Sequence, residues 1–186
     1  SVKNLPTADG GMVCFNDEIL DKKARQLSWL GINKDTFTRA NKGSYKWNYN
    51  VVEVGYKYHG NSIMASLGLV ALKYLDDDNS YRKELASEYI KSLKGEVNYI
   101  KHNHGTSRHI FQVLVENRGE VIEYLTENGI FPGVHYRDNM EYTAYKGKPL
   151  KNVQYYSNRI LSLPVHLEMS IEDVKFISAH LLRVAK

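Results

Sequence analysis

The sequence predicts a mixed α/β or α+β fold. Stretches with apolar residues at helical spacing alternate with short apolar runs of the length of β-strands. Polar, irregular joints separate them, as in domains that pack helices against a sheet. The helices are expected over about residues 19–30, 62–74, 80–94, 117–128 and 170–184, and the strands over 12–15, 110–115, 131–135 and 160–163.

The first three helices carry recognisable start and stop signals. Asn16 is a residue type that caps helix N-termini, and Gly31 is suited to end the first helix. Asn61 or Ser62 can cap the second helix. The run 76–79, Asp-Asp-Asp-Asn, is expected to interrupt the second helix, and a third helix follows it and ends at Gly95.

The last two helices carry similar signals. The stretch 117–120 is a capping pattern, and Gly129 closes the helix that follows it. The stretch 170–173 resembles a capping box with Asp173 at the position where Glu is usual. Residues 137–152 are polar and are expected to form a loop.

The first predicted strand follows two glycines that permit a tight loop. Met12 to Phe15 is a short apolar run after Gly10 and Gly11. Cys14 lies inside this run, so its thiol is expected to be buried and inert.

The composition indicates a soluble globular protein. The chain has 186 residues, of which 42% are hydrophobic and 25% charged. A single cysteine cannot form an internal disulfide, and no apolar run approaches the roughly 20 residues that span a bilayer. Without a secretory signal pattern, a cytoplasmic protein with no membrane segment is expected.

Neither the charge nor the histidines predict a nucleic-acid or metal site. The net charge of +4 is small, and the basic residues are spread along the chain rather than clustered. His102, His104, His109 and His135 lack the spacing of known metal sites and have no paired cysteines. No nucleic-acid partner and no metal are therefore expected.

Lys3 is the residue whose side chain is the strongest candidate for covalent chemistry. A lysine whose pKa is lowered by its surroundings can form an imine with an aldehyde. Lys3 precedes the loop that contains Gly10 and Gly11. The residues alone leave two interpretations open, a reactive amine and an ordinary surface lysine.

A family resemblance begins at Lys3. The stretch VKNLPTADGGMV at residues 2–13, followed by Asn16 and Asp17, resembles the signature of the DegT/DnrJ/EryC1/StrS sugar aminotransferases. Further segments resemble that family in the same order along the chain. They are VGYKYH at 54–59, GI at 129–130 with GVHY at 133–136, ILSLP at 160–164, and 170–174.

The resemblance implies a fold and a division of the chain. The family comprises pyridoxal-phosphate enzymes of the aspartate-aminotransferase fold, also called fold type I. Residues 1–96 would then be the C-terminal part of the large cofactor-binding domain with linking helices. Residues 97–186 would be the small C-terminal α/β domain. Because the family's chains are longer, this chain is expected to be a C-terminal half that needs an N-terminal half, in cis or in trans.

The resemblance also implies site residues. In the family, the lysine before the acidic-Gly-Gly motif forms the Schiff base with pyridoxal phosphate, which makes Lys3 the implied catalytic residue. Lys57 matches a position that reaches the cofactor phosphate of the partner subunit, which implies a homodimer; otherwise it is a solvated lysine. The implied substrate-binding residues are His109, His135, Tyr136, Trp47 and Tyr49. A purely structural His-Tyr pair at 135–136 is the alternative.

The implied reaction is transfer of an amino group, with glutamate as the expected donor, to a nucleotide-linked keto-sugar. Related dehydratases carry histidine in place of the lysine, so Lys3 favours transamination. Gly60 departs from the family's bulky residue at that position. Two alternatives stay open: an inactive truncated or split fragment that serves in binding or assembly, and a basic nucleic-acid module without a recognisable readout motif.

Overall fold

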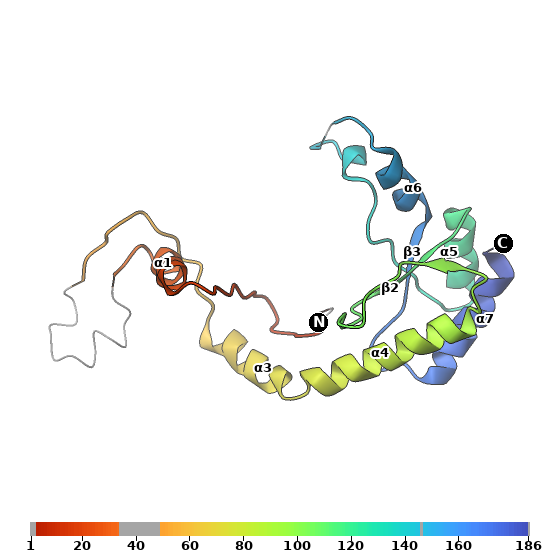
Figure 1. The fold of residues 1–186 in the computed structure, drawn as a ribbon, viewed down its shortest axis with the longest axis horizontal. Coiled ribbons are helices and arrows are strands. Elements are labelled where there is room, and N and C mark those ends of the chain that lie inside the picture. The colour runs from red at the N-terminus through yellow and green to blue at the C-terminus, as the bar shows by residue number, and fades with distance from the viewer. Residues whose placement is uncertain (1–2, 34–48, 146, 186) are drawn as a thin grey trace. The chain divides into compact units, whose positions relative to one another are not determined.

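The computed structural model describes residues 3–33, 49–145 and 147–185 (Figure 1). Contacts within these residues form two compact units, one ending at Leu72 and one beginning at Lys73. We refer to them as the N-terminal unit and the C-terminal unit. The domain boundary at residue 96, implied by the family resemblance, stays a prediction about the parent enzyme. Within this chain, residues 73–96 pack with the C-terminal unit.

The N-terminal unit contains helices α1 (Glu18–Ser28) and α3 (Ser62–Leu72), both of which the sequence predicted. The Asp17 carboxylate caps α1 by accepting from the backbone N–H groups of Ile19 and Leu20, so the expected cap at Asn16 is wrong by one residue. Asn61 caps α3, as one of the two predicted alternatives, by accepting from the N–H of Met64 at 3.0 Å.

Gly31 and Gly55 allow close backbone contact between the segment after α1 and the segment before α3. Trp29 pairs with Lys57, and Ile32 pairs with Val51, in isolated antiparallel bridges. Gly31 has a φ of +72°, and a Cβ placed there would lie 1.9 Å from the carbonyl oxygen of Glu53. Only glycine fits that backbone conformation and that approach.

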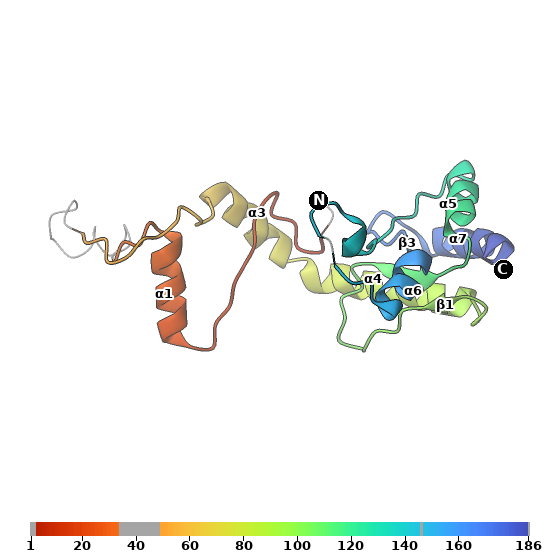
Figure 2. The ribbon, with the colours of Figure 1, turned by 90° about the horizontal axis from the view of Figure 1, so that it is seen from above.

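The predicted strand at Met12–Phe15 is wrong. This segment forms an extended run that leads into α1 (Figure 2), and within the described residues it pairs with no strand. Met12 is 81% exposed, and the expected burial of Cys14 is also wrong, because its side chain is exposed. An apolar run becomes a strand only when another strand satisfies its backbone groups, and sequence alone does not identify that partner.

The C-terminal unit contains an antiparallel three-stranded sheet of order β1-β2-β3. Strand β2 (Phe111–Leu114) lies between β1 (Asn98–Tyr99) and β3 (Ile160–Leu163), with Phe111 opposite Leu163. The predictions of β2 and β3 are confirmed, whereas the short β1 was not predicted. The strand expected at 131–135 is reduced to one isolated bridge between Gly133 and Ser162.

Four α-helices and a 3-10 turn complete the described part of the C-terminal unit. They are α4 (Leu75–Ser92), α5 (Arg118–Glu127), η1 (Asn139–Glu141), α6 (Lys151–Arg159) and α7 (Ile171–Val184). The acidic run 76–78 does not interrupt a helix; it forms the first turn of α4, where negative charge is favourable beside the helix N-terminus. Helix α6 was not predicted, whereas the capping box of Ser170 and Asp173 on α7 is confirmed.

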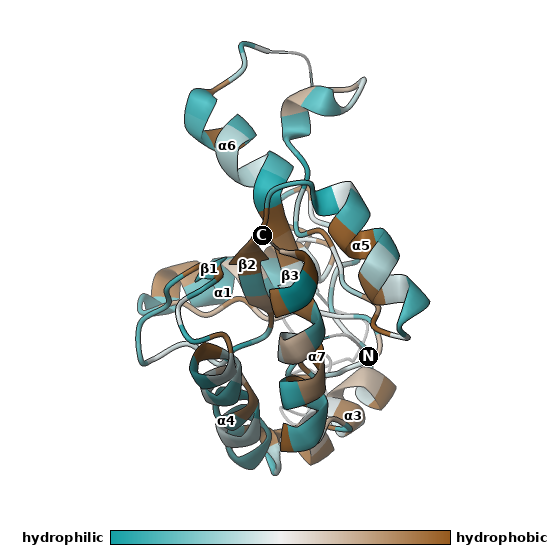
Figure 3. Ribbon diagram, turned by 90° about the vertical axis from the view of Figure 1, so that its right-hand side faces the viewer, coloured by the Kyte–Doolittle hydropathy of each residue, from teal (hydrophilic) through white to brown (hydrophobic). Residues whose placement is uncertain are grey.

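The core of the C-terminal unit lies between its helices and its sheet. Helices α4 and α7 pack side by side (Figure 3). The Tyr89 ring on α4 stacks on Phe111 of β2 at 4.9 Å between centroids, and its hydroxyl donates to the Pro164 carbonyl at 3.0 Å. Burial raises the pKa of Tyr89, which keeps this hydroxyl protonated as a donor. The buried apolar residues are Leu85, Ala86, Tyr89, Leu93, Val97, Phe111, Val113, Val115, Val121, Leu125, Ile130, Leu161, Leu163, Val165, Met169, Val174, Ile177 and Leu181.

Candidate active site

The predicted site residues divide between the two units. Lys3, Tyr49 and Lys57 belong to the N-terminal unit, and Trp47 lies outside the described residues. His109, His135 and Tyr136 belong to the C-terminal unit. We describe the surroundings of each group within its own unit.

The loop that follows Lys3 lies against helix α3. A Cβ placed on Gly68 of α3 would come within 3.2 Å of the Thr7 methyl group, and one on Gly10 would come within 2.7 Å of the Met64 methyl group. Small residues on both sides therefore permit this close approach. Lys3 itself is exposed, at the start of a loop anchored to a helix by packing.

Lys57 lies on the face of an indole ring. Its ammonium nitrogen is 3.7 Å from the centroid of Trp29, within the range of a cation–π interaction. The same ring system contacts His59 in a T-shaped arrangement, with centroids 4.1 Å apart and an interplanar angle of 84°. The sequence analysis did not single out Trp29 or His59, because the segments that carry them meet only through tertiary pairing.

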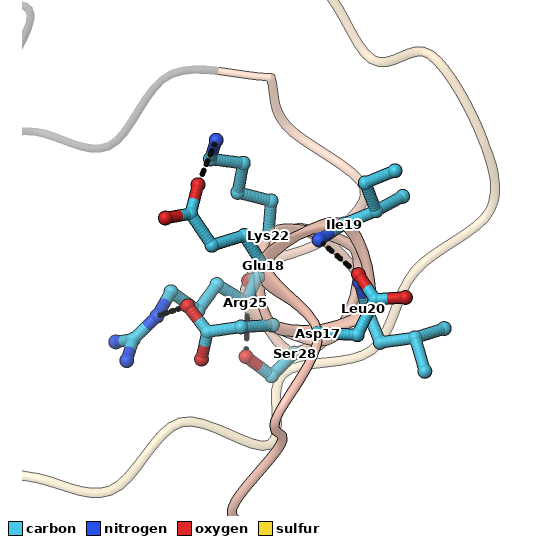
Figure 4. A network of polar contacts seen from close by, with 8 residues as sticks. Asp17, Glu18, Ile19, Leu20, Lys22, Arg25 and Ser28 are labelled. Atoms are coloured by element: carbon cyan, nitrogen blue, oxygen red, sulfur yellow. Dashed lines mark hydrogen bonds and ion pairs between the residues drawn. The ribbon is translucent and has the colours of Figure 1, made fainter.

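The basic residues of α1 are paired with carboxylates. Lys22 contacts Glu18 at 3.2 Å and Arg25 contacts Asp21 at 2.8 Å, each one helical turn away (Figure 4). The hydrogen bond from Arg25 holds the pKa of Asp21 below its ordinary value. Because these charges have partners, they are less available to an incoming anion.

Lys57 differs from those residues. In the part of the chain that the structure describes, no carboxylate forms an ion pair with it. A cavity of about 710 Å³ lies beside its aromatic neighbours, lined among others by Trp29, Ile32 and His59. The arrangement presents an exposed ammonium group suited to bind an anion such as a phosphate.

In the C-terminal unit, His135 is held by two neighbouring strands. Its Nδ1 lies 2.9 Å from the Ser162 hydroxyl on β3, and its carbonyl accepts from the Gln112 side chain of β2 at 2.8 Å. The adjacent Tyr136 ring contacts the His135 ring edge-on at 5.0 Å, yet Tyr136 is 70% exposed. His135 is thus fixed, while Tyr136 has a free surface for a ligand.

Tyr136 borders a cavity of about 610 Å³ that sequence reasoning missed. Its lining includes Asp138 and, from α6, Tyr156 and Ser157. Asp138 is buried; its N–H donates to the Ser157 hydroxyl at 2.7 Å and its carboxylate accepts from the N–H of Met140 at 2.9 Å. The cavity was missed because residues 137–152 were assigned to a loop and α6 was not predicted.

The remaining predicted substrate residues are less constrained. His109 is half-buried just before β2, and Tyr49 is 45% exposed. Among the described residues, no three His, Cys, Asp or Glu side chains gather as a metal site would require. The described helices also include none whose length and apolar character would let it cross a membrane.

Comparison with known proteins identifies the family. The model of the DegT/DnrJ/EryC1/StrS aminotransferase family matches residues 1–182. The chain belongs to this family. The resemblance that began at Lys3 is therefore confirmed over nearly the whole chain.

Individual relatives support the assignment of this chain to the DegT/DnrJ/EryC1/StrS aminotransferase family. It is 31% identical to a UDP-4-amino-4,6-dideoxy-N-acetyl-beta-L-altrosamine transaminase of Campylobacter jejuni, covering 98% of this chain and 50% of that protein. It superposes on the PMP form of the putative sugar aminotransferase Spr1654 of Streptococcus pneumoniae with a TM-score of 0.81 and 29% identity. That match covers 98% of this chain and 50% of Spr1654.

These comparisons confirm the predicted fold class, a C-terminal portion of a pyridoxal-phosphate transferase of fold type I. The chain spans about half the length of the relatives it matches. Pyridoxal phosphate is the cofactor of the family, and Spr1654 is known in both PLP and PMP forms. The residues present fit such a group: Lys3 offers a primary amine for its aldehyde, and the Lys57 ammonium, which forms no ion pair among the described residues, suits its phosphate.

Proposed function

We propose that this chain is the lysine-bearing half of an enzyme that transfers an amino group from an amino acid, glutamate, to a nucleotide-linked keto-sugar. Family membership supports an aminotransferase, and the Campylobacter jejuni relative is named as a UDP-amino-sugar transaminase. The product class would be an amino sugar.

One structural observation carries this proposal. The N-terminal unit presents an amine, Lys3, on a loop packed against α3, together with the Lys57 ammonium on the segment that precedes α3, for which the described residues provide no ion pair. An aldehyde and a phosphate are the two groups that these side chains bind best, and pyridoxal phosphate carries both.

The two lysines have separate tasks in the proposed reaction. Pyridoxal phosphate, when bound, supplies the electron sink that stabilises negative charge on the substrate carbon. The amine of Lys3 acts as the base that takes the proton from the α carbon of the amino donor. In the second half-reaction it returns a proton to the sugar carbon that gains the amino group. Lys57 binds the phosphate as a point charge, from the partner subunit of a homodimer.

The C-terminal unit supplies the proposed sugar contacts. His135 is oriented by Ser162, and Tyr136 projects its ring beside the cavity that Asp138 and Tyr156 line. A ring with a hydroxyl at its tip suits a sugar nucleotide, which offers both flat and polar surfaces. We place His109, Tyr49 and Trp47 in the same role. The division into a large domain up to residue 96 and a small domain after it belongs to this proposal.

A second candidate is a chain that binds or assembles without catalysing. The observation that favours it is the coverage, since the chain corresponds to only 50% of its Campylobacter jejuni relative. Residues from an N-terminal half, in the same protein or in a companion chain, would restore activity under the first proposal and would not under the second.

Replacement of Lys3 tests the proposed function. The test protein is the chain joined to the N-terminal half of the Campylobacter jejuni transaminase, or its own complete protein. We expect Lys3→Ala to abolish covalent cofactor attachment, seen as loss of the bound cofactor's visible absorbance, and to reduce amination of nucleotide keto-sugars by about three orders of magnitude or more. Lys83→Ala, at an exposed lysine of α4, is the matched control and should change neither. Turnover that survives Lys3→Ala would exclude the proposed role.

A further inference from the structure

We infer that Trp29 is a positioning residue that holds the Lys57 ammonium in place for the cofactor phosphate. The inference rests on the proposed function, because it concerns how Lys57 is prepared for its anion. Trp29 itself need not touch the ligand. Its role is to give a flexible side chain one preferred position.

The geometry of the pair is that of a cation–π interaction. The Lys57 nitrogen lies 3.7 Å from the Trp29 centroid. Tryptophan has the strongest face for such contacts among the aromatic residues, and separations up to about 6 Å are effective. The pair is therefore well inside the attractive range.

The backbone fixes the two residues opposite each other. Trp29 and Lys57 are partners in an antiparallel bridge, so their side chains emerge next to each other. On either side, the Leu30 N–H donates to the Tyr56 carbonyl at 3.0 Å, and the Tyr58 N–H donates to the Ser28 carbonyl at 3.0 Å. The His59 ring also packs against the indole in a T-shaped arrangement. The backbone bridge thus sets the two residues opposite each other, and the contact with His59 adds a neighbour of the ring that is independent of the Lys57 side chain.

An aromatic face leaves the positive charge of Lys57 uncompensated, whereas a neighbouring carboxylate would compensate it. Lys23 in the same unit contacts the Glu53 carboxylate, which compensates its charge. The indole face attracts the ammonium but carries no net charge, so Lys57 keeps its full positive charge for an anion. Holding the four-carbon stem beforehand also reduces the conformational entropy lost when phosphate binds.

The binding test compares two replacements of Trp29 in the holoenzyme described above. Trp29→Leu removes the ring face and should weaken pyridoxal phosphate binding about three- to fivefold, whereas Trp29→Phe should recover part of that loss. Pyridoxal, which lacks the phosphate, is the second probe. Its affinity should be unchanged by Trp29→Leu, whereas a general loss of structure would weaken both ligands.

Lys57→Ala separates the inference from the proposed function. If Lys57→Ala weakens pyridoxal phosphate binding and Trp29→Leu does not, Lys57 binds phosphate and the role of Trp29 is wrong. If neither replacement has an effect, the phosphate role of Lys57 in the proposed function fails. If both weaken binding and the double variant is no worse than Lys57→Ala, Trp29 acts through Lys57.

A second measurement uses the same complete protein without its cofactor. The ring current of Trp29 should move the NMR signals of the Lys57 ε-methylene protons upfield from ordinary lysine positions. Trp29→Leu should return them, while the signals of Lys22, paired with Glu18, stay in place. Ordinary shifts for Lys57 in the unmodified chain would overturn the inference.

Discussion

The two units of this chain differ in how far they bury their apolar side chains. In the C-terminal unit, Leu85 and Leu181 are 0% exposed at the centre of a core. In the N-terminal unit, Val54 is 87% exposed and Ile63 on α3 is 75% exposed. Of the buried apolar residues in the described part of the chain, Ile32 alone belongs to the N-terminal unit.

The residues of the proposed reaction are distributed over both units. The two lysines of the proposed reaction belong to the unit without a core of its own, whereas His135 and Tyr136 belong to the unit that has one. Exposed apolar side chains such as these contribute little burial to the free energy of folding. We therefore expect the C-terminal unit to carry most of the folding stability of the chain by itself.

The largest expected effect compares a core leucine with an α3 residue. Leu181→Ala removes a fully buried side chain and should reduce the free energy of unfolding by about 2–5 kcal/mol. Ile63→Ala removes an exposed one and should change it by no more than about 0.5 kcal/mol. Urea unfolding of the chain, followed by circular dichroism, measures both. Equal losses would show that the N-terminal unit contributes a core that the structure does not contain.

A smaller effect compares two tyrosines. Tyr89→Phe removes the donor to the Pro164 carbonyl inside the C-terminal core and should cost about 1 kcal/mol of unfolding free energy. Tyr58→Phe changes a side chain of the N-terminal unit that is 76% exposed, and should have almost no effect. Thermal unfolding of both variants makes the comparison. A Tyr89→Phe variant as stable as the unmodified chain would argue against a tightly formed core.

The smallest effect concerns pH and the capping box of α7. The N–H and hydroxyl of Ser170 donate to the Asp173 carboxylate and hold its pKa below the ordinary value of 3.8. Because the folded-state pKa is the lower one, the stabilisation is present above pH 3.8 and is lost as pH falls through the folded-state pKa.

Asp173→Asn should therefore lower stability at neutral pH, and the difference from the unmodified chain should shrink in acid. Urea unfolding at a series of pH values checks this. Asp9→Asn, at an exposed aspartate of the N-terminal unit, is the control and should change the free energy of unfolding at neutral pH by no more than about 0.5 kcal/mol. A constant difference at every pH would exclude the proposed role of the carboxylate.

Local signals were the part of the fold that could be predicted. The capping box at Ser170 involves residues three positions apart, and α1, α3, β2 and β3 follow periodic apolar patterns. Helix α6 has nine residues, most of them polar, and Ser157 is its one buried residue, so packing of this helix against the core leaves no clear signal in its sequence.

The residues of the candidate site also divide into those with a local sequence signal and those without one. Lys3 and Lys57 could be predicted as site residues because they lie in contiguous family motifs. Trp29 was not found, since it precedes its partner by a long stretch of chain and meets it only through a backbone bridge. The buried Asp138 was missed for a similar reason, as its hydrogen-bond partner Ser157 lies on the unpredicted α6.

By itself, the sequence determined the family, the lysine-bearing loop and the positions of most helices, because these depend on neighbouring residues. The tertiary structure decided which apolar residues are buried. Cys14 and Leu161 both lie in short apolar runs, yet Cys14 is exposed while Leu161 lies on β3 with a paired strand beside it. Burial requires a partner surface, and a partner surface is a property of the folded chain rather than of a local pattern.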